Sequence, residues 1–342
     1  MSSPLVNGPL VHESRPGPGQ WARSWFDLVR IYNVPIPLCG MLAGAYAAPV
    51  EPTLRFLVVI FAAIVGSAST QSFNDYEDRA SDATHAPFRP IPSGKLKSSS
   101  VLFGGHLLAV ILAVVSLALE PMAVLPVFGA FALTRKYSAL KKHTVLHHLM
   151  MPGALALTPL YGSLIVHGQV LPLAWISAAG IFLGDINMNV VGSFKDLWET
   201  SEQERVLPVV IGPKPAIAVA LVCGVAGMAV QAGSVVIGWA HAGALIPLVP
   251  ACALTIWSRL RLYEEPSAKV GYSALQAGRI AECLSFPALI AGVVRVDHAL
   301  AIILCLMLLA LYTQTIIPEN ILPDKASALL DDGQTNVQSV KS

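Results

Sequence analysis

Residues 55–82 read RFLVVIFAAIVGSASTQSFNDYEDRASD, an apolar run that passes without a break into the polar segment 74–82. A helix needs about 20 mostly apolar residues to cross the hydrocarbon core of a bilayer, and the run approaches that length. If the helix continues into the polar segment, Asn74, Asp78 and Asp82 recur at every fourth position and share one stripe. The stretch therefore predicts a membrane helix that ends in a row of oxygen-bearing side chains.

The whole chain is too apolar for a soluble protein. It has 342 residues, of which 54% are hydrophobic and 13% are charged, whereas an ordinary soluble domain carries about 25% charged residues. The net charge of +1 gives no field that attracts an acidic polymer. The five cysteines show no C-x-x-C spacing, so we expect neither a disulfide frame nor a zinc site. The composition excludes a cytosolic globular enzyme, a disordered protein and a nucleic-acid binder, and indicates a polytopic membrane protein in a lipid bilayer.

Apolar stretches recur along the chain and predict an all-α membrane bundle of nine or ten transmembrane helices. The count stays open because only a polar step at 295–298 separates the last two stretches. The candidate spans are 34–50, 55–73, 101–119, 121–135, 146–166, 171–192, 215–237, 241–257, 280–296 and 299–317. Residues 1–25 and 318–342 are polar and are expected to be tails, with no signal peptide, around a membrane domain at 26–317.

The positive charges predict the orientation of the bundle. With an even number of spans, all but Arg55 and Arg295 of the 22 Lys and Arg residues lie on one side of the membrane. They fall in the two tails and in the connections 74–100, 135–145, 193–214 and 258–279. Because positively charged loops stay in the cytoplasm, we expect these loops and both termini to be cytoplasmic. Acidic residues do little for topology, so the acids crowded into two of these loops need another explanation.

The first acidic loop predicts a magnesium site. Asn74, Asp78 and Asp82 offer two carboxylates and a carboxamide, an oxygen-only set that suits Mg²⁺, and the nitrogen and sulfur ligands typical of zinc are missing. The alternative is a solvated helix end. Residues 89–94, RPIPSG, predict a rigid turn that returns Arg89 toward the acids, which favours a binding site.

Two motifs carry a resemblance to a known family. The segment NDYEDRASD, followed by RPIPSG, resembles the first signature of the UbiA superfamily of intramembrane prenyltransferases, which includes UbiA-type terpene cyclases. Residues 137–144, YSALKKHT, are similar to the Y-P-x-x-K-R-x-T of that family. Arg30 and Asn33 match an R-x-x-N that opens several members. The resemblance covers roughly residues 25–300.

The second acidic loop departs from the family pattern. Residues 195–209, KDLWETSEQERVLPV, are similar to N-D-L-R-D-x-x-G-D followed by T-L-P-V, but Glu199 and Gln203 stand at the positions of two aspartates, and the segment is shorter. Asp196, Glu199 and Glu202 still share a helical face. We therefore expect a second metal with altered geometry; the alternative is again a solvated helix end.

The resemblance implies a set of site residues. Mg²⁺ would stabilise the pyrophosphate that leaves as a polyprenyl diphosphate ionises. The implied catalytic and metal-binding residues are Asn74, Asp78, Asp82, Asp196 and Glu199, with Glu202 as a further metal ligand. Diphosphate binding falls to Arg89, Tyr137, Lys141, Lys142 and Lys195.

Two polar residues lie inside a predicted span, where such residues are functional candidates by default. Asp185 and Asn189 are four residues apart and share a helical face. We assign them to substrate binding, either as an extension of the polar pocket or as a site for an acceptor hydroxyl. The alternative is a buried hydrogen bond between helices.

Three functions remain open. The first is transfer of the prenyl cation to an aromatic or other nucleophilic acceptor. The second is cyclisation without an acceptor, as in UbiA-type terpene cyclases, which the altered second loop favours slightly. The third, a transporter, is disfavoured because the acids lie at the membrane face and not at its midplane.

Overall fold

The structure is a computed structural model that describes residues 18–85, 87, 89–141, 143–195 and 205–316. These residues form helices and no strand, which confirms the predicted all-α class. The α-helices are α1 (Pro18–Val29), α2 (Pro35–Ala45), α3 (Leu54–His85), α4 (Ser98–Leu119), α5 (Val124–Lys141), α6 (Met150–His167), α7 (Pro172–Lys195), α8 (Leu207–Ile211), α9 (Pro213–Val236), α10 (Leu245–Glu264), α11 (Ala268–Ser285) and α12 (Val296–Ile316). Short 3-10 helices join several of them, including Val145–Leu149 before α6 and Ala288–Gly292 after α11.

Six helices in the described part of the chain are long and apolar enough to cross a membrane. They are α3, α4, α6, α7, α9 and α10, the third and last extended by the 3-10 turns that precede them. The apolar helices α2 and α12 are shorter, and α5 and α11 complete the bundle. Each span predicted from 34–50 through 241–257 coincides with one of these helices, so the protein is a polytopic helical membrane protein.

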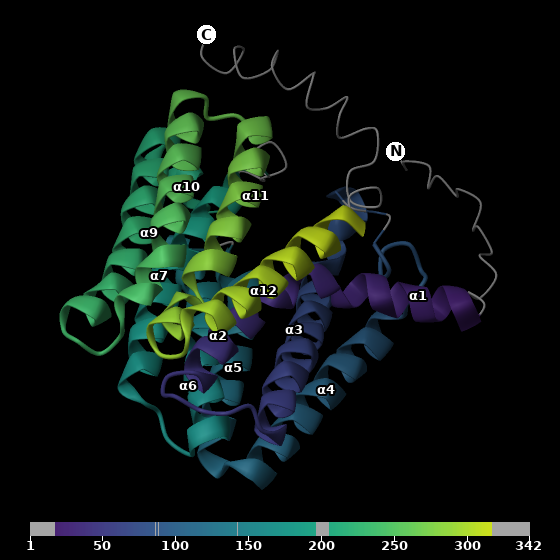
Figure 1. The fold of residues 1–342 in the computed structure, drawn as a ribbon. Helices are drawn as coiled ribbons and strands as arrows, with labels where there is room; N and C mark the ends of the chain where they lie inside the picture. Colours follow the sequence, from purple (N-terminus) through teal and green to yellow (C-terminus); the bar gives the residue numbers. More distant parts are fainter. Residues whose placement is uncertain (1–17, 86, 88, 142, 196–204, 317–342) are drawn as a thin grey trace, which may run out of the picture.

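Figure 1 shows how the helices are grouped. The green helices α9, α10 and α11 stand together on one side, the blue helices α3 and α4 stand on the other, and α12 runs obliquely across the bundle. α2 packs on α6, and α7 packs on α9 and α11. The contact between α2 and α6 is close enough that a Cβ atom at Gly162 would collide with the carbonyl oxygen of Met41. Small residues at such crossings let two membrane helices approach each other.

The predicted connection at 258–279 is wrong. α10 continues to Glu264 and α11 begins at Ala268, so most of this stretch is helical. Arg259, expected in a cytoplasmic loop, is 0% exposed inside the bundle. The positive-inside rule assigns Arg259 to a loop because the rule treats every arginine as solvent-exposed. In the structure its side chain is held by neighbouring helices.

The span predicted at 280–296 is also wrong. The helix there ends at Ser285, and Pro287 follows, which has no N–H to continue helical hydrogen bonding. A 3-10 turn then leads to α12. The true helix α11 begins twelve residues before the predicted span, among Lys269 and other polar residues that hid it from a search for apolar runs.

α3 is longer than a membrane is thick. Its 32 residues extend about 48 Å, compared with about 30 Å for the hydrocarbon core. Its four acidic residues all lie in its final third, from Asp75 onward. The helix therefore carries its acids past the apolar layer, as the spacing of Asn74, Asp78 and Asp82 predicted.

α2 is too short to cross the hydrocarbon layer by itself, since its 11 residues extend about 16 Å. One polar side chain satisfies a carbonyl group at its end, since His167 donates from Nε2 to the Ala45 carbonyl oxygen at 2.9 Å. In the neighbouring α6, the Ile165 carbonyl oxygen accepts from Arg55 Nη1 at 2.6 Å. Backbone groups in lipid must be satisfied internally, so the His167 contact stabilises α2 where it ends.

Candidate active site

A cavity of about 490 Å³ lies between α2, α3, α4, α5, α6, α7 and α11. Its two long walls differ in chemistry. The wall from α3 to α6 is largely apolar and includes Ala63, Gly66, Leu112, Phe131 and Leu155. The wall from α7 and α11 carries polar and charged side chains, namely Asp185, Asn189, Ser193, Arg279 and Glu282. The cavity therefore suits a molecule with an apolar chain and a polar group.

The acidic end of α3 meets two arginines. Asn74 lines the cavity, and the next residue, the buried Asp75, forms an ion pair with Arg30. Almost two helical turns further along α3, the Arg89 Nη1 atom lies 2.6 Å from Asp82 Oδ1. Asp82 Oδ2 is buried and has no hydrogen-bond partner among the described residues. Buried polar atoms in proteins as a rule have a hydrogen-bond partner. A buried carboxylate oxygen without one is therefore suited to bind a cation.

The turn after α3 returns Arg89 to the acids of α3, as the sequence predicted. The Ser93 N–H donates to the Arg89 carbonyl at 3.0 Å, and the Gly94 N–H donates to the Ile91 carbonyl at 3.0 Å. Gly94 has a φ of 76°, a conformation that glycine adopts at little cost. Burial lowers the pKa of Arg89, but Asp82, Asp75 and Asp78 together raise it above its ordinary value. The guanidinium stays charged beside the acids, where it can bind an anion.

The pairing of Arg30 with Asp75 was not predicted from the sequence, although Arg30 begins the R-x-x-N motif. Arg30 has a φ of 47°, the only positive value outside glycine in the described chain. Such a backbone costs about 1–3 kcal/mol and persists where surrounding contacts hold it. Both Arg30 and Asn33 line the cavity. The motif and the adjacent Asp75 were the available signals, but only tertiary structure brings them together.

A histidine pair links the second motif to the segment after the second acidic loop. Tyr137 lines the cavity, as does His147, and their ring centroids are 5.6 Å apart. The Leu207 N–H donates to His148 Nε2 at 3.1 Å. This contact fixes the start of α8 against the turn before α6. Val206, the residue before α8, lines the cavity.

The intramembrane pair Asp185 and Asn189 lines the cavity, as the sequence predicted. Asn189 Nδ2 donates to Asp185 Oδ2 at 2.9 Å within α7. Glu282 of α11 lies within hydrogen-bonding reach of Asp185. Glu282 was missed by the sequence analysis, although an acid in an apolar region of a membrane protein is itself a signal.

Several predicted site residues cannot be placed against the cavity. Lys141 and Lys195 are the last residues of α5 and α7, and only their backbones are described. Lys142, Asp196, Glu199 and Glu202 lie outside the described residues. The described part of the chain holds no group of three or more His, Cys, Asp or Glu side chains that could bind a metal. A metal at Asp78 and Asp82 would therefore need further oxygen ligands, and Mg²⁺ commonly takes them from water and phosphate.

Fold and cavity together define a helical membrane protein whose polar site opens into an apolar pocket. The chain belongs to the UbiA prenyltransferase family, whose model matches residues 34–278, and it is a membrane prenyltransferase.

Curated relatives agree with this assignment, and a solved structure shares the fold. The chain is 27% identical over 269 residues to a digeranylgeranylglyceryl phosphate synthase of Pyrococcus abyssi, covering 77% of this chain and 96% of the relative. It is 28% identical to the enzyme of the same name from Pyrococcus horikoshii, over 56% of this chain and 70% of the relative. A UbiA homologue from Archaeoglobus fulgidus bound to DMAPP and Mg²⁺ shares the fold with a TM-score of 0.63 and 14% identity, covering 82% of this chain and 99% of that one.

Proposed function

We propose that this enzyme uses Mg²⁺ to ionise a polyprenyl diphosphate and transfers the prenyl group to a nucleophilic acceptor, releasing pyrophosphate. The observation that carries the proposal is the orphaned Oδ2 atom of Asp82 beside Arg89, on α3 about two helical turns beyond Asn74, which lines the cavity. A carboxylate can bind a cation, and the arginine beside it can bind an anion. A metal diphosphate contains both kinds of charge. The solved structure with bound DMAPP and Mg²⁺ supports the same ligand class.

The proposed site residues would contact different parts of the donor molecule. Asp78, Asp82 and Asn74 would hold the metal, which supplies positive charge to the departing pyrophosphate. Arg89, together with Lys141, Lys142 and Lys195, would bind the phosphate oxygens, and Tyr137 would donate a hydrogen bond to them. The apolar wall with Leu112 and Phe131 would hold the isoprenoid chain and exclude water from the cation.

The second acidic loop is proposed to complete this site with Asp196, Glu199 and Glu202. We expect Glu199→Gln to slow donor ionisation at limiting Mg²⁺ without changing the product. The substitution keeps the shape of the side chain and removes the charge, whereas the cavity determines the product. Pyrophosphate release over a Mg²⁺ titration measures the effect, and Gln203→Asp is the matched variant that should be tolerated. Wild-type behaviour of Glu199→Gln would show that this loop is only a solvated helix end.

The names of the relatives indicate which class of acceptor should be tested first. The names of the two Pyrococcus enzymes describe synthesis of a glyceryl phosphate lipid with two geranylgeranyl groups. An acceptor hydroxyl on an isoprenoid glyceryl lipid is therefore the first candidate for this chain, and an aromatic acceptor is the second.

Purified protein in lipid nanodiscs tests the proposal. It is incubated with geranyl or geranylgeranyl diphosphate and Mg²⁺, with and without geranylgeranylglyceryl phosphate or a phenol. Pyrophosphate release with formation of an adduct supports transfer. A cyclic product without acceptor would identify a cyclase, and the absence of turnover with every diphosphate would refute the proposed function.

The active-site loops are proposed to face the cytoplasm, as the charge asymmetry indicates. In a background without the five native cysteines, we expect Ser81→Cys to react with an impermeant maleimide only from the cytoplasmic side. Gln169→Cys, exposed at the turn between α6 and α7, should react only from the opposite side and serves as the control. Labelling of both from one side would contradict the span assignment.

A further inference from the structure

The polar wall of the cavity contains an acid pair that the proposed donor site does not use. Asp185 of α7 and Glu282 of α11 are close enough to interact, and both line the cavity. Asn189 donates to Asp185 Oδ2 at 2.9 Å and so holds that carboxyl group in place. The pair sits on two packed helices, which gives it the rigid support that binding sites need.

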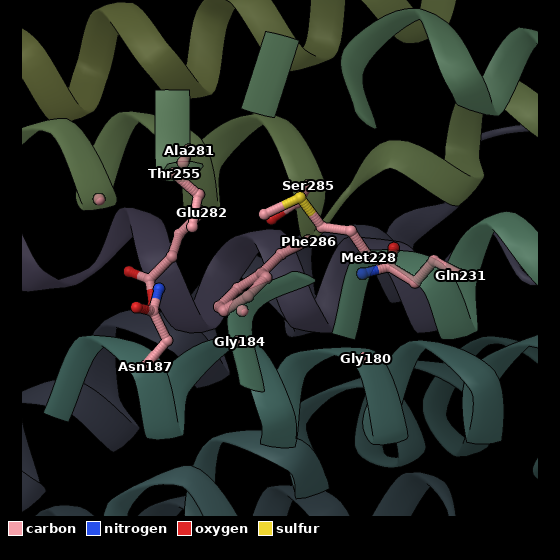
Figure 2. Close-up of a pocket in the computed structure, with 12 residues that line it drawn as sticks. Gly180, Gly184, Asn187, Met228, Gln231, Thr255, Ala281, Glu282, Ser285 and Phe286 are labelled. Carbon is pink, nitrogen blue, oxygen red and sulfur yellow. The ribbon is translucent and has the colours of Figure 1, made fainter. Parts of the chain in front are cut away.

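Glu282 has unused hydrogen-bonding capacity. The residue is only 6% exposed, yet its Oε1 atom has no partner in the described part of the chain. Figure 2 shows Glu282 and Asn187 extending toward one another at a small void next to the main cavity. Asn187 Oδ1 accepts a hydrogen bond of 2.8 Å from Arg259 Nε. Glu282 therefore lies between a fixed buried network and the open cavity, with one oxygen unsatisfied.

The hydrogen-bonding groups of this wall select the kind of ligand head that fits. Two guanidinium groups act on Glu282, that of Arg279, which lines the cavity, and that of Arg259. Arg259 donates to Asn187, Ser258 and the Ala274 carbonyl, and Glu282 Oε1 remains without a donor in the described part of the chain. A hydroxyl or an amine can donate a hydrogen bond to Glu282, whereas an ionised carboxylate has no proton to donate.

The position of the pair separates it from the diphosphate. Asp185 lies ten residues before the end of α7 at Lys195, about 15 Å along the helix axis. The end of α7 and the acidic end of α3 lie on the same side of the bundle, because α4, α5, α6 and α7 alternate in direction. The pair is thus displaced inward from Asp78 and Asp82.

We propose that Asp185 and Glu282 bind the hydrogen-bond-donating head of the acceptor, a hydroxyl or amine carried on an apolar chain. The assignment of this head to an acceptor rests on the proposed prenyl transfer. The apolar wall holds the donor chain, and the acid pair holds the acceptor against it.

Binding of three probes with one chain and different heads tests the proposal without turnover. Geranylamine, geraniol and geranic acid are titrated by calorimetry into the protein in zwitterionic nanodiscs, with empty nanodiscs subtracted and without Mg²⁺ or diphosphate. We expect the wild type to bind geranylamine at least about tenfold more tightly than geranic acid, with geraniol between them. The double variant Asp185→Asn, Glu282→Gln should reduce this preference to less than about threefold.

Two controls make the result decisive. Asp78→Asn should keep the preference, which shows that the amine does not bind at the acids of α3. Unchanged binding of geranyl diphosphate with Mg²⁺ shows that the double variant is folded; if it is not, Glu282→Gln alone takes its place and must weaken the preference. The proposal is overturned if the wild type shows no preference, if the variant keeps it, or if Asp78→Asn abolishes it. Failure of prenyl transfer itself would appear only in the pyrophosphate assay.

Discussion

Asp78→Ala and Asp82→Ala are each expected to lower turnover at least about a hundredfold, because each removes an oxygen ligand where negative charge develops on pyrophosphate. A hundredfold loss corresponds to about 2.7 kcal/mol of transition-state stabilisation, which is the range for removing one electrostatic contact in an active site. Pyrophosphate release at saturating donor and Mg²⁺ measures the loss. Size-exclusion profiles should remain unchanged, since both residues lie near the end of α3.

Glu77→Gln is the matched control on the same turn. Glu77 is paired with Arg135 at 3.1 Å, away from Arg89 and Asp82. We expect this variant to keep activity within about twofold, since exposed ion pairs contribute little. Retention of more than about a tenth of the activity by both aspartate variants would refute the metal assignment.

Arg259→Met is expected to destabilise the bundle by at least about 3 kcal/mol, because it leaves several buried acceptors without a donor. The guanidinium donates to Asn187 Oδ1 at 2.8 Å, to the Ala274 carbonyl at 2.8 Å and to Ser258 Oγ at 3.0 Å. It thereby connects α10 to both α7 and α11. The midpoint of unfolding in increasing SDS, or on heating in one detergent, measures the change.

Arg261→Ala gives the comparison within the same helix. Arg261 is exposed and lies over the ring of Trp257 at 5.4 Å. Its loss should change the unfolding free energy by less than about 1 kcal/mol. Equal effects of the two substitutions would show that Arg259 does not hold the helices together.

The sequence could predict the parts of the site that depend on local spacing. Asn74, Asp78 and Asp82 align because the helical repeat places every fourth residue on one stripe, and α3 has that form. Arg89 returns to Asp82 because they are only seven residues apart along the chain, and Arg89 opens the RPIPSG turn, which contains two prolines and a glycine. Asp185 and Asn189 face the cavity for the same local reason.

The contacts between distant segments could not be predicted in this way. Arg30 reaches Asp75 only because α1 and the turn that follows it pack on α3, and Glu282 reaches Asp185 only because α11 lies against α7. The position of α11 was itself mistaken, since its interior-facing polar residues lower its mean hydropathy. A helix that buries charge against its neighbours does not show the apolar run by which a lipid-facing helix is found.

The length of α3 has a consequence for substrate binding. Its acids lie beyond the hydrocarbon layer while the cavity wall that it forms lies within it, so the two ends of a prenyl diphosphate would rest in different solvents. Such a molecule arrives by diffusing in the plane of the bilayer. The quantity that governs its binding is then its mole fraction among the lipids, not its molarity in the surrounding buffer. Added lipid without substrate lowers occupancy, whereas added water leaves it unchanged, and the membrane itself sets the working concentration.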